Sequence, residues 1–160
     1  MKGMSIIMKN KYLIGVVLIL MIIAGIVIVN RYRKIVNYNG DILSFEYEFG
    51  GYPDGIYNYK IYTEKGKVYI LAKGMNGVDL NIYKENDTSV LTNLSNIINE
   101  NRIYEWNGFN KKSNILDGYS FSLVIKYNDG KEVQAYGHEK YPTNYKNIHK
   151  LLLNYLNSIK

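Results

Sequence analysis

The chain has 160 residues and a formal net charge of +6, with 20 Lys and Arg against 14 Asp and Glu. It has no cysteine, which excludes disulfides, thiol nucleophiles and thiolate metal sites. Six of the bases and none of the acids lie in residues 1–34, so the remainder holds 14 of each and is formally neutral. A neutral domain gains nothing from counterion release on a polyphosphate, and we predict no nucleic-acid partner.

The stretch Tyr12–Val29 contains no charged side chain and continues into Asn30 and Arg31. A helix of this length, at about 1.5 Å per residue, approaches the hydrocarbon thickness of a bilayer. We therefore expect a short basic tail over residues 1–11, an uncleaved transmembrane helix over residues 12–30 and a juxtamembrane connector over residues 31–40. The expected protein is a single-pass signal anchor of the cell membrane, with the lipid bilayer as its first partner.

The bases that flank this predicted helix are equally divided, so the positive-inside rule leaves both orientations open. The free amine of the tail favours a cytoplasmic N-terminus and an extracytoplasmic C-terminal domain. A cytoplasm-facing, membrane-tethered interaction module is the alternative. The flanking bases are Lys2, Lys9, Lys11, Arg31, Arg33 and Lys34.

Residues 41–160 are predicted to form one soluble α+β domain. Apolar and polar side chains alternate in its first half, as in strands with one buried face, and Gly-rich turns separate the runs. The pattern predicts an antiparallel meander. Its four strands are expected near residues 43–49, 57–62, 68–72 and 78–83.

The period then changes to that of a helix, which is expected from about Thr88 to Asn101. Two further alternating runs meet at Asn128-Asp129-Gly130, a strong hairpin signal, and Pro142 marks the start of a last helix. The predicted fold is therefore an antiparallel sheet of about six strands packed with two helices. Its order is four strands, a helix, two strands and a helix.

Six aromatic residues are candidates for partner contact. Trp106 and Phe109 are open to two interpretations. They contact the membrane interface or a ligand, or they are core residues that fill the space where the chain passes from the helix back to the sheet. Four tyrosines fall on nominally polar strand faces and would form an exposed aromatic surface unless a second layer covers them. These are Tyr62, Tyr69, Tyr83 and Tyr136.

No catalytic, cofactor or metal motif is present. His138 and His149 lack the spacing of a metal site or a catalytic triad, and Pro142 interrupts any zinc-binding helix after His138. Ser120 and Ser122 lack the Gly-x-Ser-x-Gly elbow of hydrolases. We predict no cofactor and no catalytic residue, and a small enzyme acting on a cell-surface substrate is the alternative.

Four motifs in the second half resemble an uncharacterised bacterial family of membrane- or lipid-anchored α+β domains. The resemblance implies a single α+β unit presented at the cell envelope, with no established activity to carry over. We therefore predict a non-catalytic extracytoplasmic domain that binds an envelope protein or a glycan. The motifs are Trp106-Asn107-Gly108-Phe109, Asp117-Gly118-Tyr119-Ser120-Phe121-Ser122-Leu123, Tyr127-Asn128-Asp129-Gly130-Lys131 and Tyr141-Pro142-Thr143-Asn144-Tyr145.

Overall fold

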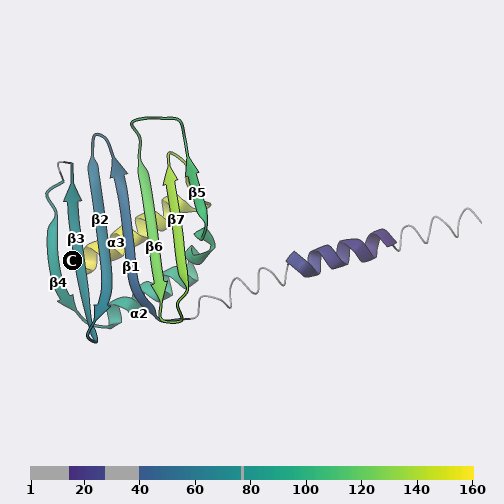
Figure 1. The fold of residues 1–160 in the computed structure, drawn as a ribbon, viewed down its shortest axis with the longest axis horizontal. Helices are drawn as coiled ribbons and strands as arrows, with labels where there is room; N and C mark the ends of the chain where they lie inside the picture. Colours follow the sequence, from purple (N-terminus) through teal and green to yellow (C-terminus); the bar gives the residue numbers. More distant parts are fainter. Residues whose placement is uncertain (1–14, 28–39, 77) are drawn as a thin grey trace, which may run out of the picture. The chain divides into compact units, whose positions relative to one another are not determined.

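The computed structural model describes residues 15–27, 40–76 and 78–160. The chain divides into two units, Met1–Asn39 and Gly40–Lys160. The described part of the first unit is an α-helix over residues 15–27. The second unit contains the sheet and the other helices (Figure 1).

The prediction of a transmembrane helix over residues 12–30 is wrong. In the described ranges, no helix is both long enough and apolar enough to cross a membrane. The prediction of a single-pass signal anchor is therefore wrong as well. The predicted tail over residues 1–11 and residues 31–39 of the predicted connector lie outside the described residues.

The second unit is an α+β fold built on one sheet of seven strands. The strands lie in the order β4-β3-β2-β1-β6-β7-β5, so the first meander occupies one half of the sheet (Figure 1). All neighbours are antiparallel except β5 and β7, which run parallel. The strands are β1 (Ile42–Gly51), β2 (Gly55–Glu64), β3 (Lys67–Met75), β4 (Asn81–Asn86), β5 (Phe109–Lys112), β6 (Ser120–Tyr127) and β7 (Glu132–His138).

The predicted sheet of about six antiparallel strands is therefore corrected to a mixed sheet of seven. The missed strand is β5, which has four residues, three of them exposed. So short an edge strand shows no alternation in sequence, and only its pairing with β7, from Phe109 opposite Ala135 to Lys112 opposite His138, makes it a strand.

One face of the sheet is apolar because the strands alternate as their sequences predict. Phe45 and Tyr47 of β1, Ile61 of β2, Ile70 of β3 and Leu123 of β6 are fully buried. The helices α2 (Ser89–Glu100) and α3 (Tyr145–Ile159) both lie against this face (Figure 1). The sheet and the two helices thus form two layers around one core.

Each helix contributes a stripe of three buried residues at helical spacing. Burying one such aliphatic side chain stabilises the fold by about 1.5–3 kcal/mol. The two helices are also joined directly, because the hydroxyl of Tyr155 donates a hydrogen bond of 2.6 Å to the carbonyl oxygen of Val90. The stripes are Val90, Leu94 and Ile98 in α2, and Ile148, Leu152 and Leu156 in α3.

The turn between β1 and β2 lies close to the segment that precedes β6. Gly50 has a φ of 130°, and a Cβ at this position would collide with the backbone of Gly55. A Cβ on Gly51 would collide with the carbonyl of Gly118. This hairpin and the start of β6 are therefore held together at one end of the sheet.

Candidate functional site

Three of the four predicted surface tyrosines meet on the sheet face opposite the helices. The rings of Tyr62 and Tyr69 are 5.7 Å apart, and those of Tyr69 and Tyr83 are 5.6 Å apart with planes only 7° from parallel. We call Tyr62, Tyr69 and Tyr83 the tyrosine row. It crosses β2, β3 and β4, and Tyr83 at its outer end is 64% exposed.

The tyrosine row presents less aromatic surface than three separate rings would, because its members stack on one another. Tyr69 in the middle stacks on both of its neighbours, and the side chains of Tyr62 and Tyr83 also interact with each other. Tyr136 does not join the row, since β1 and β6 separate its strand β7 from β2. The ammonium of Lys112 lies 5.3 Å from the centre of the Tyr136 ring.

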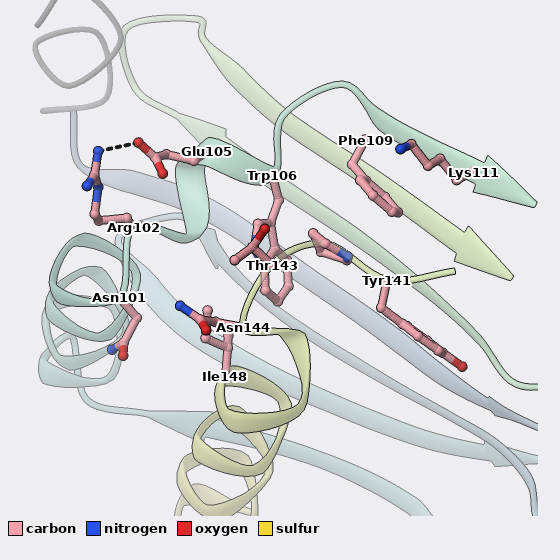
Figure 2. A pocket seen from close by; sticks show the side chains of 11 residues that line it. Asn101, Arg102, Glu105, Trp106, Phe109, Lys111, Tyr141, Thr143, Asn144 and Ile148 are labelled. Carbon is pink, nitrogen blue, oxygen red and sulfur yellow. Dashed lines mark hydrogen bonds and ion pairs between the residues drawn. The ribbon is translucent and has the colours of Figure 1, made fainter. Parts of the chain in front are cut away.

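Trp106 and Phe109 line a cavity of about 490 Å³, which we call the tryptophan cavity. The end of α2, the 3₁₀ helix η1 (Ile103–Trp106), β5 and the segment before α3 enclose it (Figure 2). Trp106 is only 5% exposed, and its ring packs against Phe121 and Tyr145. Trp106 therefore closes the core and also forms part of a cavity wall.

The tryptophan cavity has an aromatic side and a polar side. Figure 2 shows Trp106, Phe109 and Tyr141 on one side, with Asn101 and Asn144 on the other. The amide of Asn101 donates a hydrogen bond of 2.9 Å to the carbonyl oxygen of Ile97, which fixes this residue on the last turn of α2. An occupant would thus meet ring surfaces and amide groups at once.

The charges around this cavity are two cations and one anion. The guanidinium of Arg102 forms an ion pair with Glu105, and Lys111 places its ammonium 5.6 Å from the centre of the Phe109 ring (Figure 2). A hydrogen bond to Tyr104 and the charge of Glu105 raise the pKa of Arg102 above its usual value. The first turn of α3, which begins beside Asn144, carries no acidic residue to offset its positive dipole end.

Two residues that line the tryptophan cavity have a left-handed backbone although neither is glycine. Arg102 has φ 55° and ψ 37°, and Asn144 has φ 61° and ψ 12°. Asparagine tolerates this conformation, whereas arginine pays a steric cost. Such conformations cluster at ligand sites because the surrounding structure must hold them.

The two histidines lie apart from each other. His138 ends β7, and its Nε2 is 2.7 Å from the carbonyl oxygen of Ile115. His149 lies in α3, with its Nδ1 2.6 Å from the hydroxyl of Tyr47, and burial lowers its pKa. Within the described ranges, no group of three His, Cys, Asp or Glu residues could hold a metal ion.

The sequence reasoning missed a second cavity lined by His149 together with Asp54, Tyr119 and Tyr141. These residues come from the β1–β2 turn, the segment before β6, the segment before α3 and α3 itself. Their separation in the chain hides their proximity. The one sequence signal in this region is the glycine-rich segment Gly50–Gly55, which is one of the Gly-rich turns expected between strands.

Comparisons with protein-family models, curated proteins and solved structures found no match to this chain. The resemblance of its second half to an uncharacterised bacterial family therefore stays a prediction.

Proposed function

We propose that the Gly40–Lys160 unit is a non-catalytic module that binds a protein or cell-envelope partner through the tryptophan cavity. The observation that carries this proposal is the composition of the cavity wall. Aromatic rings lie beside amide groups and two cationic side chains around about 490 Å³ of space. Such a mixture of an apolar floor and a few polar groups is typical of ligand sites.

The occupant that fits this wall carries an anionic group beside an apolar or aromatic one. The apolar part would cover Trp106 and Phe109, and a carboxylate would lie near Lys111 and Asn144. Since Glu105 already pairs with Arg102, the remaining uncompensated charge of the cavity is that of Lys111. An acidic side chain next to an aromatic one on a protein partner has this chemistry.

The same groups favour binding over catalysis. The guanidinium of Arg102 is charged at neutral pH as in any arginine, and the amides of Asn101 and Asn144 do not titrate. Groups of this kind hold and orient an anion without transferring a proton. The described residues that line this cavity do not include the pair of proton-transferring groups that the enzyme alternative would need.

The proposal can be tested by titrating the full chain with 3-phenylpropionate and with its neutral analogue 3-phenylpropionamide. Trp106 is the only tryptophan, so its fluorescence reports directly on this cavity. We expect the carboxylate to change the fluorescence at lower concentration than the amide, and added salt to weaken its binding. Equal affinity for the acid and the amide would contradict an anion site.

A pair of matched variants isolates the ammonium. Lys111→Gln should weaken binding of 3-phenylpropionate about threefold to tenfold, as expected for a partly exposed charge contact. Lys84→Gln removes an equal charge from the exposed strand β4, outside the cavity, and should leave the affinity unchanged. If both variants weaken binding equally, only the overall charge of the protein matters and the site is elsewhere.

A further inference from the structure

A second cavity, of about 520 Å³, lies at the end of the sheet where the β1–β2 turn approaches the start of β6. The first turns of α3 close its other side through Tyr145 and His149. We call it the tyrosine cavity. It is separate from the proposed anion site, although Tyr141 contributes to the walls of both.

Aromatic rings form a continuous wall around this cavity. Tyr57 stacks on Phe49 with ring centres 5.1 Å apart, and Phe49 meets His149 edge to face at 4.8 Å. His149 stacks on Tyr145 at 5.4 Å, and Tyr145 stacks on Tyr141 at 4.6 Å. The wall is therefore a chain of rings that hold one another in place.

The charges at the tyrosine cavity are negative. Asp54 lines it and accepts a hydrogen bond from the hydroxyl of Tyr119. Glu139 lies next to it, because its carboxylate accepts a 2.5 Å hydrogen bond from the backbone N–H of Tyr119. No lysine or arginine is among the described residues that line the cavity. An anion would meet repulsion here, whereas a cation would meet attraction.

The remaining polar groups stay uncharged at neutral pH. Burial lowers the pKa of His149, which keeps its imidazole neutral. Burial raises the pKa of Tyr145 to about 12, and the hydrogen bond to Asp54 raises the pKa of Tyr119. No cationic group of the wall therefore competes with a bound cation.

We infer that the tyrosine cavity is a binding site for an alkylammonium cation. Ring faces attract a positive charge through their quadrupole, and a desolvated ammonium beside aromatic rings is the best case of this interaction. The carboxylate of Asp54 adds a direct charge partner at the mouth of the cavity, where the residue is exposed. Rings and carboxylate together select for charge as well as for size.

The test compares choline with 3,3-dimethylbutan-1-ol, which has the same shape but no charge. Isothermal titration of the full chain should show at least about tenfold tighter binding of choline, the difference that a partly desolvated cation–π contact supplies. Equal binding of the two compounds would show an apolar pocket without preference for a cation, and the inference would fail. Failure of choline to bind at millimolar concentration would overturn it as well.

Two variants test the carboxylate. Asp54→Asn keeps the acceptor for the Tyr119 hydroxyl but removes the charge, and should weaken choline binding about fivefold to tenfold. Glu132→Gln removes an equal charge at the opposite end of β7 and should leave the affinity as it is. If Asp54→Asn and Glu132→Gln weaken choline binding equally, the affinity depends on the net charge of the protein and the inferred site is wrong.

Two variants of Tyr57 test whether cation binding requires an aromatic ring. Tyr57→Phe keeps an aromatic ring and the stack on Phe49, whereas Tyr57→Leu keeps an apolar side chain without a ring. We expect Phe to retain most of the affinity for choline and Leu to lose several-fold, with thermal unfolding confirming that both variants fold. Retention of full affinity by a folded Tyr57→Leu variant would overturn the role of the rings.

Two probes distinguish the sources of an alkylammonium group. Choline represents a quaternary ammonium, and butylammonium represents the primary amine of a lysine side chain. Once choline binds more tightly than 3,3-dimethylbutan-1-ol, tighter binding of choline than of butylammonium assigns the site to a quaternary ammonium, and the reverse order assigns it to a primary amine. Lys111→Gln separates this result from the proposed anion site, because Lys111 lines the tryptophan cavity and not the tyrosine cavity, so choline should bind this variant as it binds the wild type.

Discussion

The hydroxyl of Tyr47 lies 2.6 Å from Nδ1 of His149 and donates its proton to the hydroxyl oxygen of Tyr145, 3.1 Å away. With the Tyr47 proton directed at Tyr145, the 2.6 Å contact to His149 is a hydrogen bond only when Nδ1 carries the ring hydrogen and Nε2 the lone pair. The pKa of Tyr47 is raised, chiefly by burial, so its phenol stays protonated.

We predict that His149 is the Nδ1–H tautomer at neutral pH, which is the minor form of histidine in water. Long-range ¹H–¹⁵N correlation spectra distinguish a pyrrole-like from a pyridine-like nitrogen at each ring position. The pyrrole-like shift should belong to Nδ1 of His149. In Tyr47→Phe this donor loses its acceptor, and the Nε2–H form should gain population.

The lowered pKa of His149 predicts that acid destabilises the fold. In the unfolded chain this imidazole binds a proton near pH 6.5, whereas the folded chain binds it only at lower pH. The free energy of unfolding should thus be constant above about pH 7 with respect to this group. It should decrease as the pH falls from 6.5 through the lowered pKa.

Denaturant unfolding between pH 8 and pH 5 checks this expectation. His149→Phe keeps a ring against Phe49 and Tyr145 and should lose less stability on acidification than the wild type. His138→Gln is the matched control, and it should keep the decline because His149 remains in place. An unchanged pH slope in His149→Phe would contradict the assignment.

The tyrosine row predicts an energetic coupling between neighbouring strands. Tyr69 and Tyr83 stack across β3 and β4, and an aromatic pair contributes about 0.5–1.5 kcal/mol beyond the area it buries. A double-mutant cycle with Tyr69→Leu and Tyr83→Leu should show a coupling of this size. The same cycle with Tyr69→Leu and Tyr136→Leu should be additive within about 0.5 kcal/mol, since β1 and β6 separate the two strands.

The left-handed backbone of Arg102 predicts that a glycine variant at this position is more stable than an alanine variant. Arg102→Ala and Arg102→Gly both remove the ion pair with Glu105, so their difference isolates the backbone. The glycine variant should be the more stable by about 1 kcal/mol, because a Cβ is strained at φ 55°. Chemical denaturation measures the difference, and a more stable alanine variant would show that the backbone relaxes at this position.

The elements that sequence patterns predicted are those with local causes. Alternation in Ile42–Gly51 places Phe45 and Tyr47 on the buried face, and the spacing of Val90, Leu94 and Ile98 marks one face of α2. The Asn128-Asp129-Gly130 turn is confirmed between β6 and β7, with Gly130 at a φ of 80°. In each case a short stretch of consecutive residues is enough to predict the element.

The parts that sequence patterns missed depend on distant segments. The residues Phe109–Lys112 become β5 only through parallel pairing with β7, more than twenty residues further along the chain. The tyrosine cavity needs Asp54 and Tyr119, which are 65 positions apart, to meet. No local period encodes either contact, whereas the three members of the tyrosine row could be placed on one face from strand alternation alone.

Tyr141 lines the cavity proposed for an anion and the cavity proposed for a cation. A ligand that moves or immobilises this ring on one side therefore changes the wall that the other ligand meets. Thermodynamic linkage then requires reciprocity, so the factor by which an anion alters cation affinity equals the factor by which the cation alters anion affinity. One shared side chain thus makes the two sites measurable as a coupled pair, and the sign of their coupling reports whether one ligand favours or opposes the binding of the other.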